Sequence, residues 1–212
     1  QGKKVLLLCY NQMLAKYLKK SVKKYNEIKA DAFFEFCIDL LKVPKEQIEQ
    51  YRSNPRLYSE ALPKLMTALL LMEDISSGRL EMSTKLPVTP AATEVERSCV
   101  LGMKRGEVYT VEELLAAMMI NSHNDAAAQI AACVAGNVKD FVARMNPRAR
   151  DLGLTSASFN SPNGLPQGKK RQNSLCSVTD ITRLSEYLMR YPQLLKFCQM
   201  RSKKLHTGKV VY

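Results

Sequence analysis

The chain has 212 residues, of which 46% are hydrophobic and 25% are charged, an ordinary composition for a globular protein. No apolar run approaches the ~18 residues that a membrane-spanning helix needs, so we expect no transmembrane segment. The net charge is +12, and residues 143–212 hold 13 basic and 3 acidic residues. This excess is either a solvated basic face or a surface that attracts nucleic acid or an anionic cell-wall polymer.

Six cysteines are scattered along the chain, and none of them belongs to a Cys-x-x-Cys pair. The two histidines lie near no pair of cysteines. Metal sites need such spacings, and disulfide frameworks are typical of much smaller chains. We therefore expect no metal ion and no cofactor.

The first 56 residues are predicted to form a small α/β segment. The apolar run Val5–Cys9 is typical of a buried strand. Residues 11–24 place apolar side chains on one helical face, residues 30–43 form a second helix, and Pro44 suits the first turn of a third. Two lysines before the apolar run imitate a lipoprotein signal, but the run is shorter than a signal core of ~7–15 residues, so we expect no signal peptide.

Residues 57–77 are predicted to form a long, central helix, because their apolar side chains cover much of its circumference. Pro63 belongs in its first turn, since a proline further inside would kink the helix. Gly78 is a typical left-handed cap at its end. Residues 80–96 favour extended chain because of their prolines, and residues 100–106 favour a loop.

Two helices then meet at a short polar bend. Thr110 and Glu113 form a capping box for the first helix, which runs to about Ile120. The bend itself is Ser122-His123-Asn124, and the second helix runs from Asn124 to Ala135. We refer to these three residues as the 122–124 bend.

The remaining part continues with helices and ends in an extended segment. Residues 138–152 form another helix, and the Ser-Pro-Asn-Gly sequence at residues 161–164 is typical of a turn. Residues 177–191 form a last helix, and residues 205–212 favour a strand entering a hairpin. The chain is thus predicted to be mixed α/β and mostly helical, with a helix cluster beside a small antiparallel sheet.

Lys64 and the 122–124 bend have the residue types of serine acyl transfer. A serine nucleophile needs a base that takes its proton, and a lysine three residues further along a helix faces the same side. A second serine and an amide on a neighbouring loop can relay the proton and hold the substrate amide. Each residue also has a plain structural interpretation: Lys64 as a solvated helix lysine, Ser122 and Asn124 as helix caps, and His123 as an exposed loop residue.

From about residue 62 to residue 212 the chain resembles the low-molecular-mass penicillin-binding proteins, the serine D-alanyl-D-alanine carboxypeptidases. The resemblance rests on ordered matches, namely Lys64-Leu65-Met66-Thr67, Ser122-x-Asn124-Asp125-Ala126-Ala127, Ala149-Arg150-Asp151-Leu152-Gly153-Leu154, Phe159-Asn160-Ser161-Pro162-Asn163-Gly164-Leu165 and Tyr191-Pro192. It implies a partial penicillin-binding protein or β-lactamase-type transpeptidase fold. It also implies a location in the cell envelope and, as partners, β-lactams or peptidoglycan stem peptides ending in D-alanyl-D-alanine.

Residue by residue, the resemblance makes Lys64 the general base, Ser122 the proton-relay serine and Asn124 the ligand of the substrate amide. The nucleophile position holds Ala61, which has no hydroxyl. Ser59 lies five residues before Lys64 and therefore points to another face of the helix. The prediction is a carboxypeptidase-like domain that is inactive as written and binds its ligands non-covalently at most.

His206-Thr207-Gly208 matches the letters of the family's third signature, whose strand binds an extended peptide. Its surroundings after Tyr191-Pro192 look more like an earlier strand of the family's hairpin. Both interpretations stay open at this point. Either these three residues bind substrate, or the third strand is missing together with the last helices.

The N-terminal segment does not fit this family. On the segments Lys4-Val5-Leu6-Leu7-Leu8-Cys9-Tyr10-Asn11, Leu14-Ala15-x-Tyr17-Leu18 and Phe33-Phe34-Glu35-Phe36-Cys37, residues 1–60 weakly resemble an internal segment of superfamily 1 DNA helicases. They contain no phosphate-binding Gly-x-x-x-x-Gly-Lys loop, so no helicase activity follows. We predict two regions: residues 1–56, of different origin, and residues 57–212, a truncated penicillin-binding-protein-like domain. A fusion near residues 62–64 and a pseudoenzyme with a diverged N-terminus are competing explanations of Ala61. The alternative function is a non-catalytic basic module that binds nucleic acid or an anionic cell-wall polymer.

Overall fold

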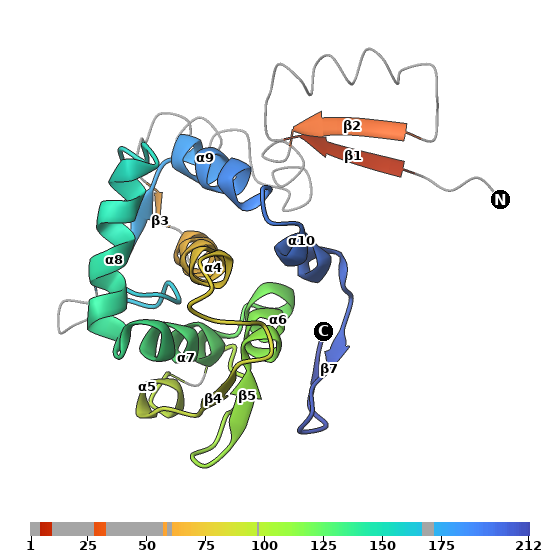
Figure 1. The fold of residues 1–212 in the computed structure, drawn as a ribbon. Helices are drawn as coiled ribbons and strands as arrows, with labels where there is room; N and C mark the ends of the chain where they lie inside the picture. The colour runs from red at the N-terminus through yellow and green to blue at the C-terminus, as the bar shows by residue number, and fades with distance from the viewer. Residues whose placement is uncertain (1–4, 10–27, 33–56, 59–60, 97, 167–171) are drawn as a thin grey trace. The chain divides into compact units, whose positions relative to one another are not determined.

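The computed structural model describes residues 5–9, 28–32, 57–58, 61–96, 98–166 and 172–212. The chain divides into two units, Gln1–Pro55 and Arg56–Tyr212. In the first unit, strand β1 (Val5–Cys9) pairs in parallel with strand β2 (Ile28–Ala32), as Figure 1 shows.

The strand prediction for Val5–Cys9 is confirmed, whereas the helix predicted over residues 30–43 is wrong at its start. Residues 30–32 belong to β2, in which Ala30 lies opposite Leu7. Backbone pairing with a distant strand outweighs the weak local preference of so short a segment. The helices predicted over residues 11–24 and after Pro44, and the rest of the second helix, lie outside the described residues.

Helix α4 lies in the middle of the second unit, and the other long helices surround it (Figure 1). The central helix is α4 (Ala61–Ser76). The surrounding helices are α6 (Val111–Asn121), α7 (Asn124–Ala135), α8 (Val138–Asp151), α9 (Val178–Leu188) and α10 (Pro192–Gln199). Met66, Leu69 and Leu71 of α4 are each at most 1% exposed. The predicted central helix is therefore confirmed, since a helix that is apolar all round must be buried.

The central helix begins later than predicted. Strand β3 (Leu57–Tyr58) occupies the first two residues of the predicted helix and pairs antiparallel with β6 (Leu175–Cys176). Pro63 then falls in the first turn of α4. A proline is tolerated there because backbone N–H groups of the first turn have no partner within the helix.

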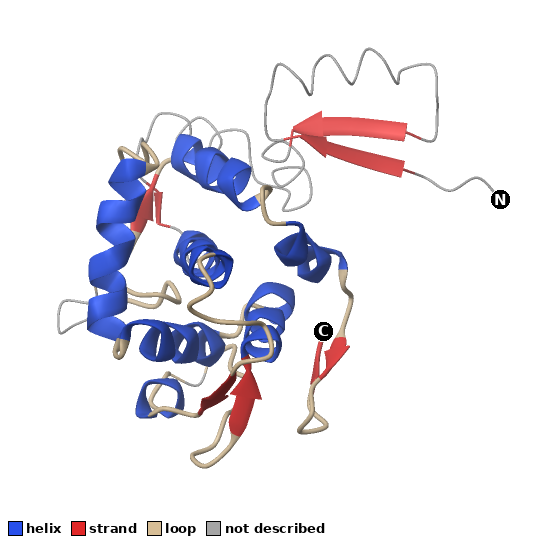
Figure 2. Cartoon of the chain, viewed as in Figure 1, coloured by secondary structure: helices blue, strands red, loops and turns tan. Residues whose placement is uncertain are grey.

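Short antiparallel pairs of strands, which Figure 2 draws in red, accompany the helix cluster. They confirm the predicted fold class. Strand β4 (Lys85–Pro87) pairs with β5 (Val108–Thr110), and β7 (Lys203–Lys204) pairs with β8 (Val210–Val211). The extended chain predicted over residues 80–96 is interrupted by the one-turn helix α5 (Pro90–Thr93). Pro90 favours this turn because its ring fixes the φ angle that a first helical residue needs.

Local signals set several helix ends. The capping box predicted for Thr110 and Glu113 is present at the start of α6. A second box, formed by Ser177 and Asp180, begins α9. The helix predicted over residues 177–191 ends early, at Leu188, and the unpredicted α10 follows because Pro192 restarts a helix.

Candidate functional site

Lys64 is buried in the first turn of α4, with 6% of its surface exposed. Its Nζ donates a hydrogen bond to the backbone oxygen of Asn163 at 2.7 Å. A buried ammonium group is tolerated only where polar partners replace its water shell. The interpretation of Lys64 as a solvated helix lysine is therefore wrong.

The turn at residues 161–164 is the partner of this lysine. Thr67, one helical turn after Lys64, donates through Oγ1 to the Pro162 oxygen at 2.8 Å. Ser161 Oγ accepts the Gly164 N–H at 3.0 Å and closes the turn. The sequence indicated a turn here, but the long-range bonds that make Lys64 depend on it were missed.

A side chain of α8 holds the strand-like segment that leads into this turn. Asn146 donates through Nδ2 to the Phe159 oxygen, and its Oδ1 accepts the Phe159 N–H, each at 2.9 Å. These two bonds imitate a backbone pairing between α8 and the segment. The turn is thus fastened to both α4 and α8, which fixes the oxygen that receives Lys64.

The 122–124 bend changes the direction of the chain between α6 and α7. Ser122 is exposed and adopts a left-handed backbone conformation, with φ 57°. Asn124 is the first residue of α7 and is 4% exposed. Its backbone N–H donates to the Cys99 oxygen and its Nδ2 to the Ser98 oxygen, each at 2.8 Å. Ser122 and Asn124 therefore also end and begin helices, as their structural interpretation predicts.

Asp125 fastens the bend to the preceding loop. Its carboxylate accepts the N–H groups of Leu101 and Gly102, each at 2.9 Å, and is 1% exposed. A buried carboxylate of this kind is stabilised by several charge-assisted hydrogen bonds at once. The loop at residues 98–103 and the start of α7 consequently form one rigid piece.

Asn163 joins the lysine to the bend. Its backbone oxygen accepts from Lys64, and its own Nδ2 donates to the Asn124 backbone oxygen at 3.4 Å. Lys64 and Asn124 lie 60 positions apart in the sequence yet share this neighbour. We call Lys64, Asn124 and Asn163 the lysine cluster.

One acceptor in the lysine cluster has no partner. Asn124 Oδ1 is buried and accepts no hydrogen bond from any residue that the structure describes. Such orphaned atoms are rare in folded proteins and mark places where a further donor belongs.

His123 is buried rather than exposed, with 6% of its surface accessible, so its predicted position is wrong. Both Ser122 and His123 donate their backbone N–H groups to the Ala117 oxygen, which closes α6. In this type of helix ending, the residue after the left-handed one packs back onto the last turn. Burial lowers the pKa of His123 from its ordinary value, and the nearby Asp125 carboxylate offsets part of this effect.

His206-Thr207-Gly208 forms the turn between β7 and β8 rather than a strand. The His206 backbone N–H and ring Nδ1 lie 2.7 and 2.8 Å from Glu113 Oε1, in the first turn of α6. Ser122 lies beyond the other end of that helix, nine residues or ~13 Å along its axis. The structure thus brings Lys64 and Asn124 together but does not bring His206 to them.

Glu113 is the anchor of this hairpin. Burial alone would raise the pKa of its carboxyl group. Hydrogen bonds from the backbone and side chains of His206 and Thr110 outweigh burial and lower the pKa to about 2. The carboxylate is thus charged and serves both the capping box and the hairpin.

Ala61 is the first residue of α4, three positions before Lys64, and Ser59 lies outside the described residues. Within the described ranges, no group of three or more His, Cys, Asp or Glu side chains could hold a metal ion. In the same part of the chain, no helix is both long and apolar enough to cross a membrane.

Comparisons with known proteins show the family of this chain. Residues 48–211 match the profile of the D-alanyl-D-alanine carboxypeptidase family, peptidase S11. The D-alanyl-D-alanine carboxypeptidase DacF of Bacillus subtilis is 34% identical over 145 residues, which is 68% of this chain and 36% of that protein. DacB2 of Mycobacterium tuberculosis is 34% identical over 105 residues, 50% of this chain and 35% of that protein.

Solved structures give the same result. A peptidoglycan synthesis regulatory factor (PBP3) from Streptococcus pneumoniae superimposes with a TM-score of 0.65 at 27% identity, covering 71% of this chain and 48% of that one. Penicillin-binding protein 6B from Escherichia coli superimposes with a TM-score of 0.67 at 24% identity, covering 73% of this chain and 49% of that one. This second likeness supports the fold. The chain therefore spans less than half the length of these relatives.

Proposed function

The chain belongs to the D-alanyl-D-alanine carboxypeptidase family, and we propose that its lysine cluster binds stem peptides ending in D-alanyl-D-alanine, or β-lactams, without forming an acyl-enzyme. The observation that carries this proposal is the bond from Lys64 Nζ to Asn163 O at 2.7 Å, together with the bond from Asn163 to Asn124. A location in the cell envelope belongs to the same proposal, because peptidoglycan lies there.

The proposal gives each side chain a role. Lys64 supplies positive charge at the position of the general base, and Ser122 presents an exposed hydroxyl on the bend. Asn124 supplies an unpaired oxygen that can accept the N–H of a peptide. The proposal includes no covalent attack on the ligand, because the methyl group of Ala61 has no lone pair to attack a carbonyl carbon.

A fluorescent penicillin tests the covalent part of the proposal. We expect no label that survives a denaturing gel, because no hydroxyl occupies position 61. The Ala61→Ser variant places a hydroxyl three residues before Lys64 and is the positive comparison. A stable label on the unaltered chain would overturn the proposed inactivity.

Titration with Nα,Nε-diacetyl-L-Lys-D-Ala-D-Ala tests the binding part by calorimetry. We expect saturable binding that Lys64→Met weakens about tenfold or more, since a lost charge-assisted bond has that effect. Lys139→Met is the matched control, because Lys139 is an exposed lysine of α8. Equal affinity in both variants, or no binding by the unaltered chain, would refute the proposal.

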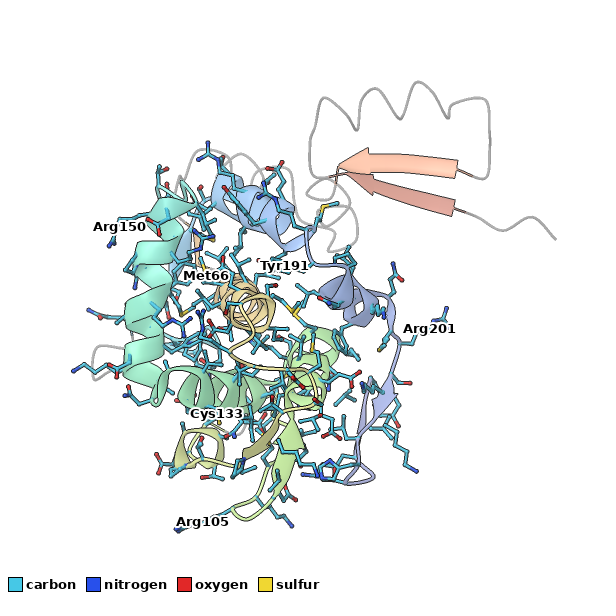
Figure 3. All side chains as sticks on the ribbon, viewed as in Figure 1. Met66, Arg105, Cys133, Arg150, Tyr191 and Arg201 are labelled. Atoms are coloured by element: carbon cyan, nitrogen blue, oxygen red, sulfur yellow. The ribbon has the colours of Figure 1, made fainter. Side chains whose placement is uncertain are left out.

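Among the residues that the structure describes, the arrangement of charges gives the basic-module alternative no support. Figure 3 shows Arg150 and Arg201 on opposite sides of the second unit. Other basic side chains of this region are ion-paired, including Arg148 with Glu73 at 2.7 Å. A nucleic-acid surface needs basic residues gathered on one face, so the carboxypeptidase-like function is preferred.

A further inference from the structure

A cavity of about 440 Å³ lies beside the first turn of α6, at the end of that helix remote from the 122–124 bend. Cavities of ~300–1,000 Å³ are the usual size for small-molecule sites. It is lined by Lys85, Val108, Thr110, Glu112, Glu113, Lys203 and His206. None of these residues belongs to the lysine cluster, so the cavity is separate from the site described above.

The outer face of the β4–β5 pair forms one wall of this cavity. Lys85 lies opposite Thr110, and Val108 is two positions from Thr110 on the same strand, so the three side chains share one face of the pair. Leu86 and Tyr109 belong to the other face and are buried in the core. Val108 is 38% exposed. The wall therefore offers hydrocarbon surface that a ligand can cover.

Both carboxylates of the lining already have partners. Glu112 Oε1 lies 2.6 Å from Lys203 Nζ. Glu113 Oε1 accepts the His206 backbone N–H at 2.7 Å and lies 2.8 Å from the His206 ring Nδ1. The Lys85 side chain, in contrast, forms no ion pair or hydrogen bond with any residue in the described part of the chain. The charged group of the lining that lacks a partner is thus a cation.

Lys203 brings a second ammonium group to the cavity, from the β7–β8 hairpin. Its Nζ lies over the Phe197 ring, 5.5 Å from the centroid, and is held there by Glu112 as well. An ammonium group has three N–H donors, so the bond to Glu112 leaves donors for a ligand. The cavity therefore contains cationic groups from two separate strand pairs.

We propose that this cavity binds a small organic anion, namely a carboxylate with a compact apolar body. The Lys85 ammonium pairs with the carboxylate, and the apolar body rests on Val108 and on the hydrocarbon stems of the lysines. The ligand is bound and not transformed. This inference goes beyond the proposed function, because it concerns the other end of α6 and a different class of ligand.

Phenylacetate and phenylacetamide are matched probes, since they differ in charge and hardly in shape. The chain has two histidines: His206 lines the cavity, whereas His123 lies beyond the far end of α6. NMR of the imidazole C–H signals at fixed pH therefore reports where a probe binds, and the His123→Asn variant assigns the signals. We expect phenylacetate to shift the His206 signals saturably and to leave the His123 signals in place.

The Lys85→Met variant tests the role of charge, because it keeps the hydrocarbon stem and removes the ammonium group. In the unaltered chain at low salt, phenylacetate should bind about two- to fivefold more tightly than phenylacetamide, the range for a partly exposed ion pair. Lys85→Met should bring the two affinities together, and high salt should reduce their ratio. Lys139→Met, which removes an exposed charge of α8, is the matched control and should keep the preference.

The Val108→Thr variant tests the apolar wall. It keeps the shape of the side chain and adds a hydroxyl group, so it should weaken both probes and leave the ratio of their affinities unchanged. Unchanged affinities in this variant would remove Val108 from the site and overturn the inference.

The other contrary results overturn it as well. Equal affinities of the two probes for the unaltered chain would show that charge has no part in binding. A preference that survives Lys85→Met would place the carboxylate elsewhere, as would a shift of the His123 signals alone or the lack of a saturable shift at His206. None of these results would affect the proposed function, which is tested with peptides ending in D-alanyl-D-alanine.

Discussion

The 122–124 bend and the hairpin turn at residues 206–208 both use a left-handed residue, Ser122 with φ 57° and Gly208 with φ 81°, but they are held by different interactions. Asn124 and Asp125 of the bend region are buried and bonded to backbone groups of the preceding loop. The hairpin turn is exposed, and carboxylates of the neighbouring elements hold the hairpin through its side chains and the His206 backbone N–H. Its contacts are His206 with Glu113, Lys203 with Glu112 and Lys209 with Glu107.

This comparison teaches which region can serve as a preorganised site. Buried bonds to backbone are insensitive to salt and hold a side chain in one place, whereas exposed ion pairs contribute little and are screened. The bend is thus suited to ligand recognition, and the hairpin mainly covers the start of α6. Four predictions probe this difference, in order of decreasing effect.

Asp125→Ala should break the bend. The variant leaves the N–H groups of Leu101 and Gly102 without their acceptor, so we expect a loss of about 2–4 kcal/mol in the free energy of unfolding. Urea denaturation measures it, and Asp151→Ala, at the exposed end of α8, is the control. A loss equal to that of the control would show that the bend is not anchored by Asp125.

Thr67→Val should loosen the turn that receives Lys64. Valine keeps the shape but removes the bond to the Pro162 oxygen, at a cost of about 1–2 kcal/mol in unfolding free energy. Binding of the diacetylated tripeptide should weaken in parallel. The exposed Thr179→Val change on α9 should alter neither quantity. Unchanged affinity in Thr67→Val would separate the turn from ligand binding.

His123 should make the bend sensitive to acid. Its pKa is lowered by burial in the folded chain, so the unfolded chain binds more protons below the ordinary value of about 6.5. Stability should therefore be complete above that pH and fall below it, by at most about 1.4 kcal/mol per pH unit. His123→Asn should lack this slope in urea denaturation between pH 7 and pH 5. Parallel curves for both proteins would contradict the assignment.

Glu113→Gln should weaken the hairpin only modestly. Glutamine can keep the capping box but loses the carboxylate that His206 contacts through its backbone N–H and ring Nδ1, so we expect about 1 kcal/mol at pH 7. The folded pKa of about 2 is depressed, so this stabilisation is present above the unfolded value and disappears as the pH falls toward 2. The two denaturation curves should converge there. Glu112→Gln, which removes one exposed ion pair, should have a smaller effect that vanishes in salt.

The predicted boundary and origin of the N-terminal region stay predictions. The family match begins at residue 48, inside the region assigned a different origin, and the two units divide after Pro55. The DNA sequence across codons 50–70 is the informative measurement. An uninterrupted homologue in a second genome would refute a fusion near residues 62–64.

The sequence by itself determined the features whose partners lie within one turn of chain. The capping boxes at Thr110 and Ser177 were predictable because donor and acceptor are three residues apart. The ordered family motifs and the missing hydroxyl at Ala61 are likewise visible in the letters alone. These properties depend on residue type and spacing, and neither changes when the chain folds.

The tertiary structure decided which of these residues contact one another. Lys64 and Asn163 are 99 residues apart, and no local pattern could indicate that the backbone oxygen of one receives the ammonium of the other. The burial of His123 and the distance of His206 from the 122–124 bend were equally hidden. Contacts of this kind depend on how whole helices pack around α4, and packing sums many weak interactions that a short stretch of sequence does not contain.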